Sequence, residues 1–359
     1  MLLFRYFNVL PKEIQDYITL LTTNKVIDLC KVNKYFNSNC KIIKITNNLK
    51  YPKLADSHLT SLINVTLLKL PNNVLITDRG IKKLSYLTSL DLSFNKIITD
   101  EAIKTLINLT FLNISGNPYV PCPKITNEGI KGLTNLNYLN LCYNDIITDE
   151  GLKGLSNLKS LDLSQNKTIT NEGIKGLISL TDLNLFNNKT ITNGLKCLIN
   201  ITHLDLSFND MVKDDNLKEL VSIKSLTLYC NKLITDIGIY KLNNLTHLDL
   251  QGNDQITSYG IRYLNNLSYL NLRGNNVIRN KGINKLFNLT YLDLSYNEHI
   301  TNDGINNLSN LTHLNLESNK ITNDGITRLT NLVTLQLRSN NMITYKGTEK
   351  LNKVNIIRY

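Results

Sequence analysis

Three histidines at one recurring position are the residues of this sequence best suited to metal binding or proton transfer. They are His203, His247 and His313. Imidazole nitrogens hold zinc when three or four ligands converge. These histidines are two and three repeat units apart, without a cysteine or a dedicated carboxylate beside them on the same face. A shared metal is therefore not expected. The sequence also has no glycine-rich phosphate loop and no nucleophile elbow, so we expect no catalytic residue, no cofactor and no enzyme activity.

The histidines belong to a sequence motif, Leu-x-x-Leu-x-Leu-x-x-Asn, that recurs about every 22 residues. A fixed period of this size predicts a solenoid, in which each unit buries its apolar side against its neighbours. Thirteen full units are present, with one spacing of 27 residues where an insertion within Pro118–Pro123 predicts an edge loop. The closing asparagines are Asn73, Asn95, Asn117, Asn144, Asn166, Asn188, Asn209, Asn231, Asn253, Asn275, Asn297, Asn319 and Asn340.

Each unit can be assigned local structure from its residue pattern. The alternating Leu-x-Leu segment predicts a strand with its leucines on one face, and successive strands from similar units must be parallel. The asparagine follows in a buried turn, where an amide can satisfy backbone groups that the turn leaves unpaired. The pair Thr148–Asp149 then predicts a helix cap, and Leu152 and Leu155 predict an inward face on a short helix or 3₁₀ turn.

This pattern resembles the leucine-rich repeat family over roughly residues 40 to 359. The resemblance implies an α/β fold: a curved solenoid with a parallel sheet inside the curve and short helices outside. We therefore expect a solenoid domain over residues 41–359.

Three outward side chains per strand should face the concave side of the sheet. The middle one is almost always Asp or Asn, a uniformity that we interpret as structural because binding surfaces are usually heterogeneous. The two flanking columns vary more and bring aromatic, imidazole and guanidinium groups together near the C-terminal end. Such groups anchor protein interfaces, although aromatic residues also cover sheets well without a partner. The residues predicted to bind a partner protein are His247, Tyr269, Arg273, Tyr291, His313, Glu317 and Arg338.

Basic residues form a second row, and the chain carries a formal charge of +11. The row stands late in the short helices, while acids such as Glu128 and Asp236 stand at their starts. This arrangement complements the helix dipole, and it gives no strong field of one sign, so nucleic-acid binding is not expected. The row comprises Lys82, Lys104, Lys131, Lys153, Lys175, Lys196, Lys218, Lys241, Arg262 and Lys285.

Residues 1–40 break the period and predict three short amphipathic helices. Their order resembles an F-box, which opens with Leu-Pro-x-Glu-Ile, although the usual late tryptophan is replaced by Phe36. The resemblance implies docking on the adaptor subunit of a cullin-type (SCF) ubiquitin ligase, with the repeats holding a target protein. The alternative is a helical cap that shields the first repeat. The residues expected to contact the adaptor are Leu10, Pro11, Ile14, Ile18, Val32 and Phe36.

The remaining features bear on location and function. No signal peptide and no membrane-spanning run are recognisable, and the six cysteines lack metal or disulfide spacing. We expect a cytoplasmic or nuclear protein that does not enter the membrane. The sequence thus predicts a substrate-recruiting ligase adaptor, or alternatively a repeat scaffold that binds a protein partner without any ligase.

Overall fold

A computed structural model describes residues 43–46, 54–59, 64–119, 124–349, 351 and 354–358 of the chain. The chain divides between Asn157 and Leu158 into two compact units, which are described separately. In both, a short strand alternates with a short helix, as the repeat pattern predicts.

The described residues of the first unit form five strands in parallel register, in the order of the sequence. Its first strand lies ahead of the first full repeat and pairs with the second strand. The elements are β1 (Ile43–Thr46), α3 (Asp56–Leu59), β2 (Val65–Lys69), α4 (Asp78–Ile81), β3 (Ser89–Asp91), α5 (Asp100–Ile103), β4 (Phe111–Asn113), α6 (Asn127–Ile130), β5 (Tyr138–Asn140) and α7 (Asp149–Leu152).

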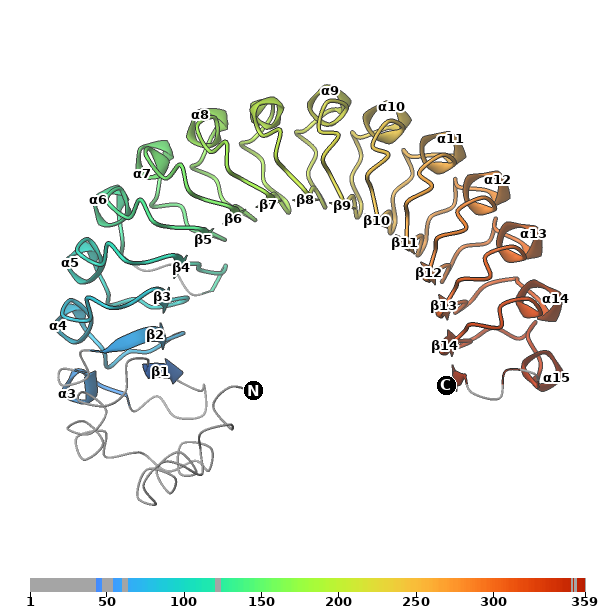
Figure 1. Cartoon of the computed structure of the whole chain (residues 1–359), viewed down its shortest axis with the longest axis horizontal. Helices are drawn as coiled ribbons and strands as arrows, with labels where there is room; N and C mark the ends of the chain where they lie inside the picture. The colour runs from blue at the N-terminus through green and yellow to red at the C-terminus, as the bar shows by residue number, and fades with distance from the viewer. Residues whose placement is uncertain are drawn as a thin grey trace, which may run out of the picture. The chain divides into compact units, whose positions relative to one another are not determined.

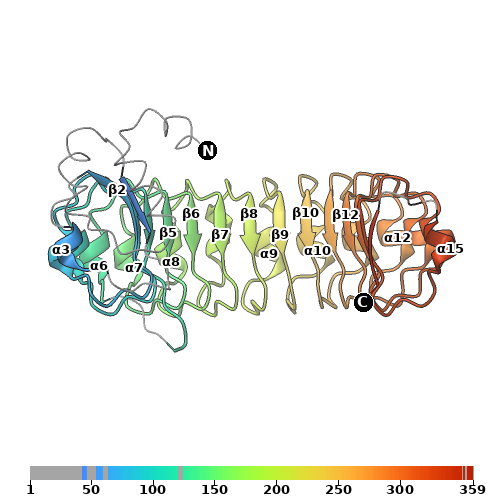
Figure 2. The same ribbon diagram turned by 90° about the horizontal axis from the view of Figure 1, so that it is seen from below.

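The part of the second unit that the structure describes forms ten strands, again parallel and paired in sequence order. Within it the strands line the inner side of a curve and the helices the outer side (Figure 1). The strands lie side by side and point the same way (Figure 2). The elements are β6 (Ser160–Asp162), α8 (Asn171–Ile174), β7 (Asp182–Asn184), η3 (Gly194–Cys197), β8 (His203–Asp205), α9 (Asp214–Leu217), β9 (Ser225–Thr227), α10 (Asp236–Ile239), β10 (His247–Asp249), α11 (Ser258–Ile261), β11 (Tyr269–Asn271), α12 (Asn280–Ile283), β12 (Tyr291–Asp293), α13 (Asn302–Ile305), β13 (His313–Asn315), α14 (Asn323–Ile326), β14 (Thr334–Gln336), α15 (Tyr345–Thr348) and β15 (Asn355–Ile357).

The core of each repeat consists of its consensus leucines and isoleucines. In the repeat around β10, for example, Leu248 and Leu250 face inward from the strand and are fully buried. Ile256 and Ile261 close the same layer from the helical side, also without exposure. The outward residues of the strands are consequently the ones that a partner can reach.

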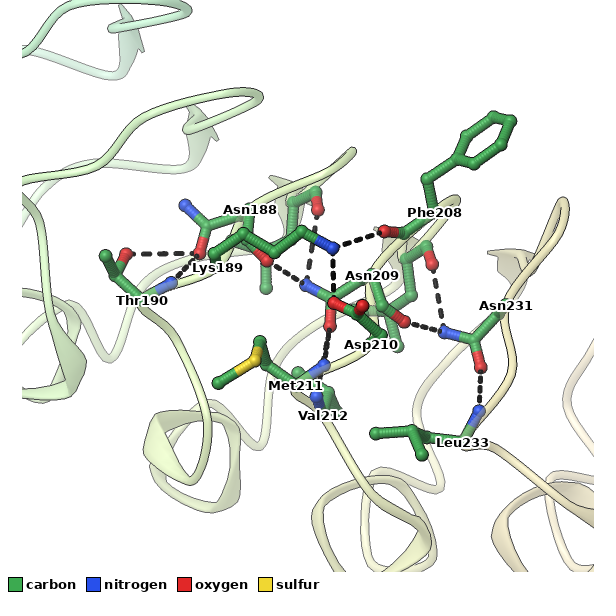
Figure 3. A network of polar contacts seen from close by, with 12 residues as sticks. Asn188, Lys189, Thr190, Phe208, Asn209, Asp210, Met211, Val212, Asn231 and Leu233 are labelled. Atoms are coloured by element: carbon green, nitrogen blue, oxygen red, sulfur yellow. Dashed lines mark hydrogen bonds and ion pairs between the residues drawn. The ribbon is translucent and has the colours of Figure 1, made fainter.

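The repeated asparagine binds its own turn and the repeat before it. The Oδ1 atom of Asn209 accepts hydrogen bonds from the backbone N–H groups of Met211 and Val212, both at 3.0 Å. Its Nδ2 atom donates to the carbonyl oxygen of Asn188 at 3.0 Å (Figure 3). Asn209 is completely buried, so these bonds satisfy backbone groups that water cannot reach. The predicted role of the asparagine ladder is therefore confirmed.

A second ladder on the helical side corrects one prediction about helix caps. Thr148 occupies the N-cap position of α7 but makes no capping bond, because Asn127 donates to its hydroxyl at 2.8 Å. Thr235 does cap α10, where its hydroxyl donates to the Asp214 carboxylate at 2.7 Å and accepts from the helix. A carboxylate only accepts, so it orients the hydroxyl hydrogen away from the helix and leaves a lone pair for the cap.

The glycine inside each of these helices leaves room for the acidic side chain of the preceding repeat. A Cβ atom on Gly238 would lie 2.5 Å from Oδ1 of Asp214. The close approach explains why Gly recurs two residues after the helix start, where its low helix propensity would otherwise be a disadvantage.

Candidate protein-binding face

Four of the predicted binding residues occupy the first outward position of four adjacent strands. His247 pairs in register with Tyr269, Tyr269 with Tyr291, and Tyr291 with His313. Strands β10 to β13 therefore bring into one column side chains that are far apart in the sequence. The sequence predicted this alignment, and the structure shows it.

The four rings form a continuous stack along that column. The centroids of Tyr269 and Tyr291 are 4.3 Å apart with 12° between the ring planes. His247 stacks on Tyr269 at 5.7 Å, and His313 on Tyr291 at 6.3 Å. Burial is the main reason that the pKa values of both tyrosines are raised above their ordinary value. Both phenols are protonated at neutral pH, and their two hydroxyl groups share a hydrogen bond.

Arg273, Glu317 and a tyrosine that was not predicted form a second cluster beside the stack. The Cζ atom of Arg273 lies 4.7 Å from the ring centroid of Tyr296. The Tyr296 hydroxyl donates to Glu317 at 2.9 Å, and Arg273 Nη1 lies 3.8 Å from the Glu317 carboxylate. This arrangement combines a cation–π contact with an ion pair. Arg338 follows β14 at the equivalent position and is exposed.

The middle column acts as a structural floor under the stack, as its uniformity predicted. The Oδ1 atom of Asp249 accepts from the backbone N–H of Gln251 at 2.8 Å. Its Oδ2 atom accepts from Nδ2 of Asn271 at 3.0 Å. Asp293 and Asn315 repeat this side-chain bond at 2.9 Å. Asp and Asn thus alternate as acceptor and donor across neighbouring strands.

The buried floor predicts a dependence of stability on pH. Desolvation raises the pKa of Asp249, and the carboxylates of Asp205 and Asp293 add to the rise. The folded chain therefore binds this proton at a higher pH than the unfolded chain does. Stability from this group is fully present below its ordinary pKa of 3.8 and is lost as pH rises through the raised value.

We expect the free energy of unfolding of Asp249→Asn, relative to that of the wild type, to be higher at pH 7 than at pH 4. Urea unfolding of both chains at the two pH values measures this difference. Asp254→Asn is the control, because Asp254 is exposed and lies outside the strand columns. An Asp249→Asn difference that does not change with pH would contradict the assignment.

A further aromatic cluster on neighbouring repeats of the second unit was also missed. Phe208 contacts Phe186 and Tyr229 edge to face, with centroids 5.5 and 4.7 Å apart. Phe208 has a positive φ of 52° and projects away from the asparagine ladder (Figure 3). A bulky residue is uncommon in that backbone region, and an aromatic residue just before the ladder asparagine was the signal available in the sequence.

Five lysines of the row on the helical side form ion pairs within the chain. Lys153 pairs with Glu150 three residues earlier, and Lys218 with Asp215. The same spacing joins Lys104 to Glu101. These contacts agree with the interpretation of the row as a complement to acidic helix starts.

Comparison with known proteins identifies the family. A family model described as Leucine Rich repeat matches residues 83–107, 132–156, 154–178, 197–221, 241–264, 263–287, 285–309, 307–329 and 328–351. Together these matches cover more than half of the chain. The protein belongs to the leucine-rich repeat family.

Solved leucine-rich-repeat structures agree with this fold. An internalin from Listeria monocytogenes is 26% identical with a TM-score of 0.61, and the match covers 85% of this chain and 89% of that one. A leucine-rich-repeat protein of Leptospira interrogans is 25% identical with a TM-score of 0.51, covering 88% and 100%. Mouse RP105, solved as the RP105/MD-1 complex, is 20% identical with a TM-score of 0.53, covering 87% and 68%. No match was found among curated proteins.

Several predictions for this leucine-rich-repeat protein concern other parts of the chain. Leu10, Pro11, Ile14, Ile18, Val32 and Phe36 lie outside the described residues, and the F-box resemblance stays a prediction. Within the described ranges, every helix is too short to cross a lipid bilayer. The same ranges contain no group of three His, Cys, Asp or Glu side chains that could hold a metal ion.

Proposed function

We propose that this leucine-rich-repeat protein is an interaction scaffold that binds a protein partner on the inner strand face of its second unit. The observation that carries the proposal is the four-ring stack from His247 to His313 beside the Arg273–Tyr296–Glu317 cluster. Tyrosine and arginine dominate the energetically important positions of protein interfaces. Here they are also held in place by their neighbours, which lowers the entropy lost on binding.

The charge on this face favours a protein over a nucleic acid. The three outward columns of strands β6 to β14 carry two arginines, Arg273 and Arg338. They also carry six acids, which would repel a phosphate backbone. The acids are Asp162, Asp182, Asp205, Asp249, Asp293 and Glu317.

A photocrosslinking experiment tests the proposed face. Benzoylphenylalanine placed at Tyr269, in the stack, should crosslink a protein partner in native extract. The same residue placed at Tyr259, on α11 and 54% exposed, serves as the matched control and should give no such product. Crosslinks at Tyr259 only, or the same products from both positions, would overturn the proposal.

The finer role, a substrate-recruiting adaptor of a cullin-type (SCF) ubiquitin ligase in the cytoplasm or nucleus, rests on the sequence of residues 1–40. Its support is the order Leu10-Pro11-Lys12-Glu13-Ile14 with Val32 and Phe36 behind it. A pull-down with the ligase adaptor subunit, comparing the wild type with Leu10→Ala/Pro11→Ala, tests this role. Retention by the wild type alone supports it, and no retention by either chain leaves the scaffold function.

A further inference from the structure

The column pattern of the inner face is interrupted at β9. At this strand the first two of the three outward positions hold the small residues Ser225 and Thr227, and the third holds Tyr229. Ser225 pairs in register with His203 on one side and with His247 on the other. Thr227 likewise lies between Asp205 and Asp249. Two imidazoles and two carboxylates therefore flank a position where the side chains are short. We call these six residues the β9 slot.

The ring of His247 forms one wall of the β9 slot. Tyr269 covers one face of this ring, with 17° between the two planes. The opposite face is consequently turned toward Ser225. His203 stands on the far side of Ser225, and its side chain is 56% exposed. Neighbouring strands are about 4.8 Å apart, so the two histidine backbones are separated by roughly 10 Å. A planar group stacked on one ring needs about 4 Å, so it fits between the two histidines.

The floor of the β9 slot lacks the amide that neighbouring strands provide. Asn271 donates to Oδ2 of Asp249, and Asn315 donates to Oδ2 of Asp293. Thr227 stands where the equivalent amide for Asp205 would be. Asp205 accepts from the backbone N–H of Ser207 through Oδ1, and no hydrogen bond reaches its Oδ2 atom from the described residues. A partly exposed carboxylate oxygen is thus open to a donor from outside the chain.

A threonine precedes each histidine of the slot and contacts its ring. The Thr246 hydroxyl oxygen lies 3.1 Å from the carbonyl oxygen of Lys224 and 2.9 Å from Nδ1 of His247. Thr202 and His203 repeat this geometry, and Nδ1 of His203 also lies 3.1 Å from Oδ1 of Asp182. Nδ1 of each ring is thus engaged within the chain.

We propose that the β9 slot binds the guanidinium group of an arginine side chain from the protein partner. A guanidinium is planar, stacks on rings and carries five N–H donors. The slot offers the open face of the His247 ring and the Asp205 carboxylate. An ammonium group has the charge but cannot stack as a plane. This inference rests on the proposed function and names one group that the partner must present.

Titration of the whole chain with a short peptide, acetyl-Gly-Gly-Arg-Gly-Gly-amide, tests the slot. Its binding is followed by NMR through the imidazole signals of His203 and His247. We expect saturable shifts at these two histidines and not at His299, which lies outside the strand columns. The citrulline peptide, which keeps the shape and loses the charge, should bind at least about tenfold more weakly. Equal shifts with both peptides would overturn the proposal.

Two variants separate slot filling from loss of fold. Ser225→Tyr copies the residue found at this position in β11 and β12, so the chain should fold and the slot should be filled. Ser160→Tyr places the same side chain on β6, away from the slot, and should leave peptide binding unchanged. Asp205→Asn should weaken binding about tenfold, because it removes a charged hydrogen bond. Wild-type affinity in Ser225→Tyr would contradict the assignment.

The outcomes also separate this inference from the proposed function. Partner crosslinks at Tyr269 without peptide binding would refute the slot and leave the proposed function intact. Peptide binding without partner crosslinks at Tyr269 would support the slot and count against the proposed function.

Discussion

Replacing Asn209 by alanine is expected to lower the free energy of unfolding of the second unit by about 3 kcal/mol, because buried polar groups would lose their partners. The backbone N–H groups of Met211 and Val212 and the carbonyl of Asn188 would each lack a hydrogen bond. These groups lie around a side chain with no solvent exposure, so water cannot replace the amide without opening the turn. Chemical denaturation followed by circular dichroism measures the change.

The matched control for this variant is Asn200→Ala. Asn200 also donates from its side chain to a backbone carbonyl of the preceding repeat, that of Ile178 at 2.9 Å, but it is exposed. Water can take over this bond, so a loss of less than about 1 kcal/mol is expected. Equal losses of unfolding free energy in the two variants would show that burial does not determine how much the asparagine ladder stabilises the fold. Hydrogen exchange should place the new opening around residues 209–212.

Replacing Tyr291 by alanine should have the largest effect on binding of the proposed partner. This ring is held between Tyr269 and His313, and its removal divides the stack in two. A central aromatic anchor contributes 2 kcal/mol or more, so we expect a loss of affinity of roughly 30-fold or more. The measurement is a titration of the crosslinked partner, once identified, by calorimetry.

A variant at the end of the stack tests whether this effect is local. Thr334 lies next to His313 on the following strand, and Thr334→Ala should change affinity less than about threefold. Unfolding curves of both variants must confirm that the solenoid is intact. A Tyr291→Ala chain that folds and binds as the wild type does would place the interface elsewhere.

The period of the sequence was sufficient to predict the strands, their order and the core. Leucines repeated at this fixed spacing are buried when the repeats stack on one another. Leu248 and Leu250 are buried as this arrangement requires. The same register predicts that Tyr269 aligns with Tyr291. Their position in one column is now observed, whereas their contact with a partner stays a prediction.

The features that were missed depend on side chains meeting across repeats. Tyr296 and Phe208 both sit at a turn position with positive φ, where other repeats have Gly252 or Gly274. Sequence spacing does not reveal the direction in which a side chain leaves such a turn. The missing cap at Thr148 has a similar origin, because it depends on whether residue 127, in the previous repeat, is Asn or Asp.

The asparagine ladder also bears on how such a chain can change in length. Asn209 carries in its own side chain both the bonds that shape its turn and the bond that attaches it to Asn188. A copied stretch of 22 residues would therefore inherit its own means of attachment, and no other part of the protein would need to adapt. One asparagine side chain in each repeat thus allows the array to grow by whole repeats.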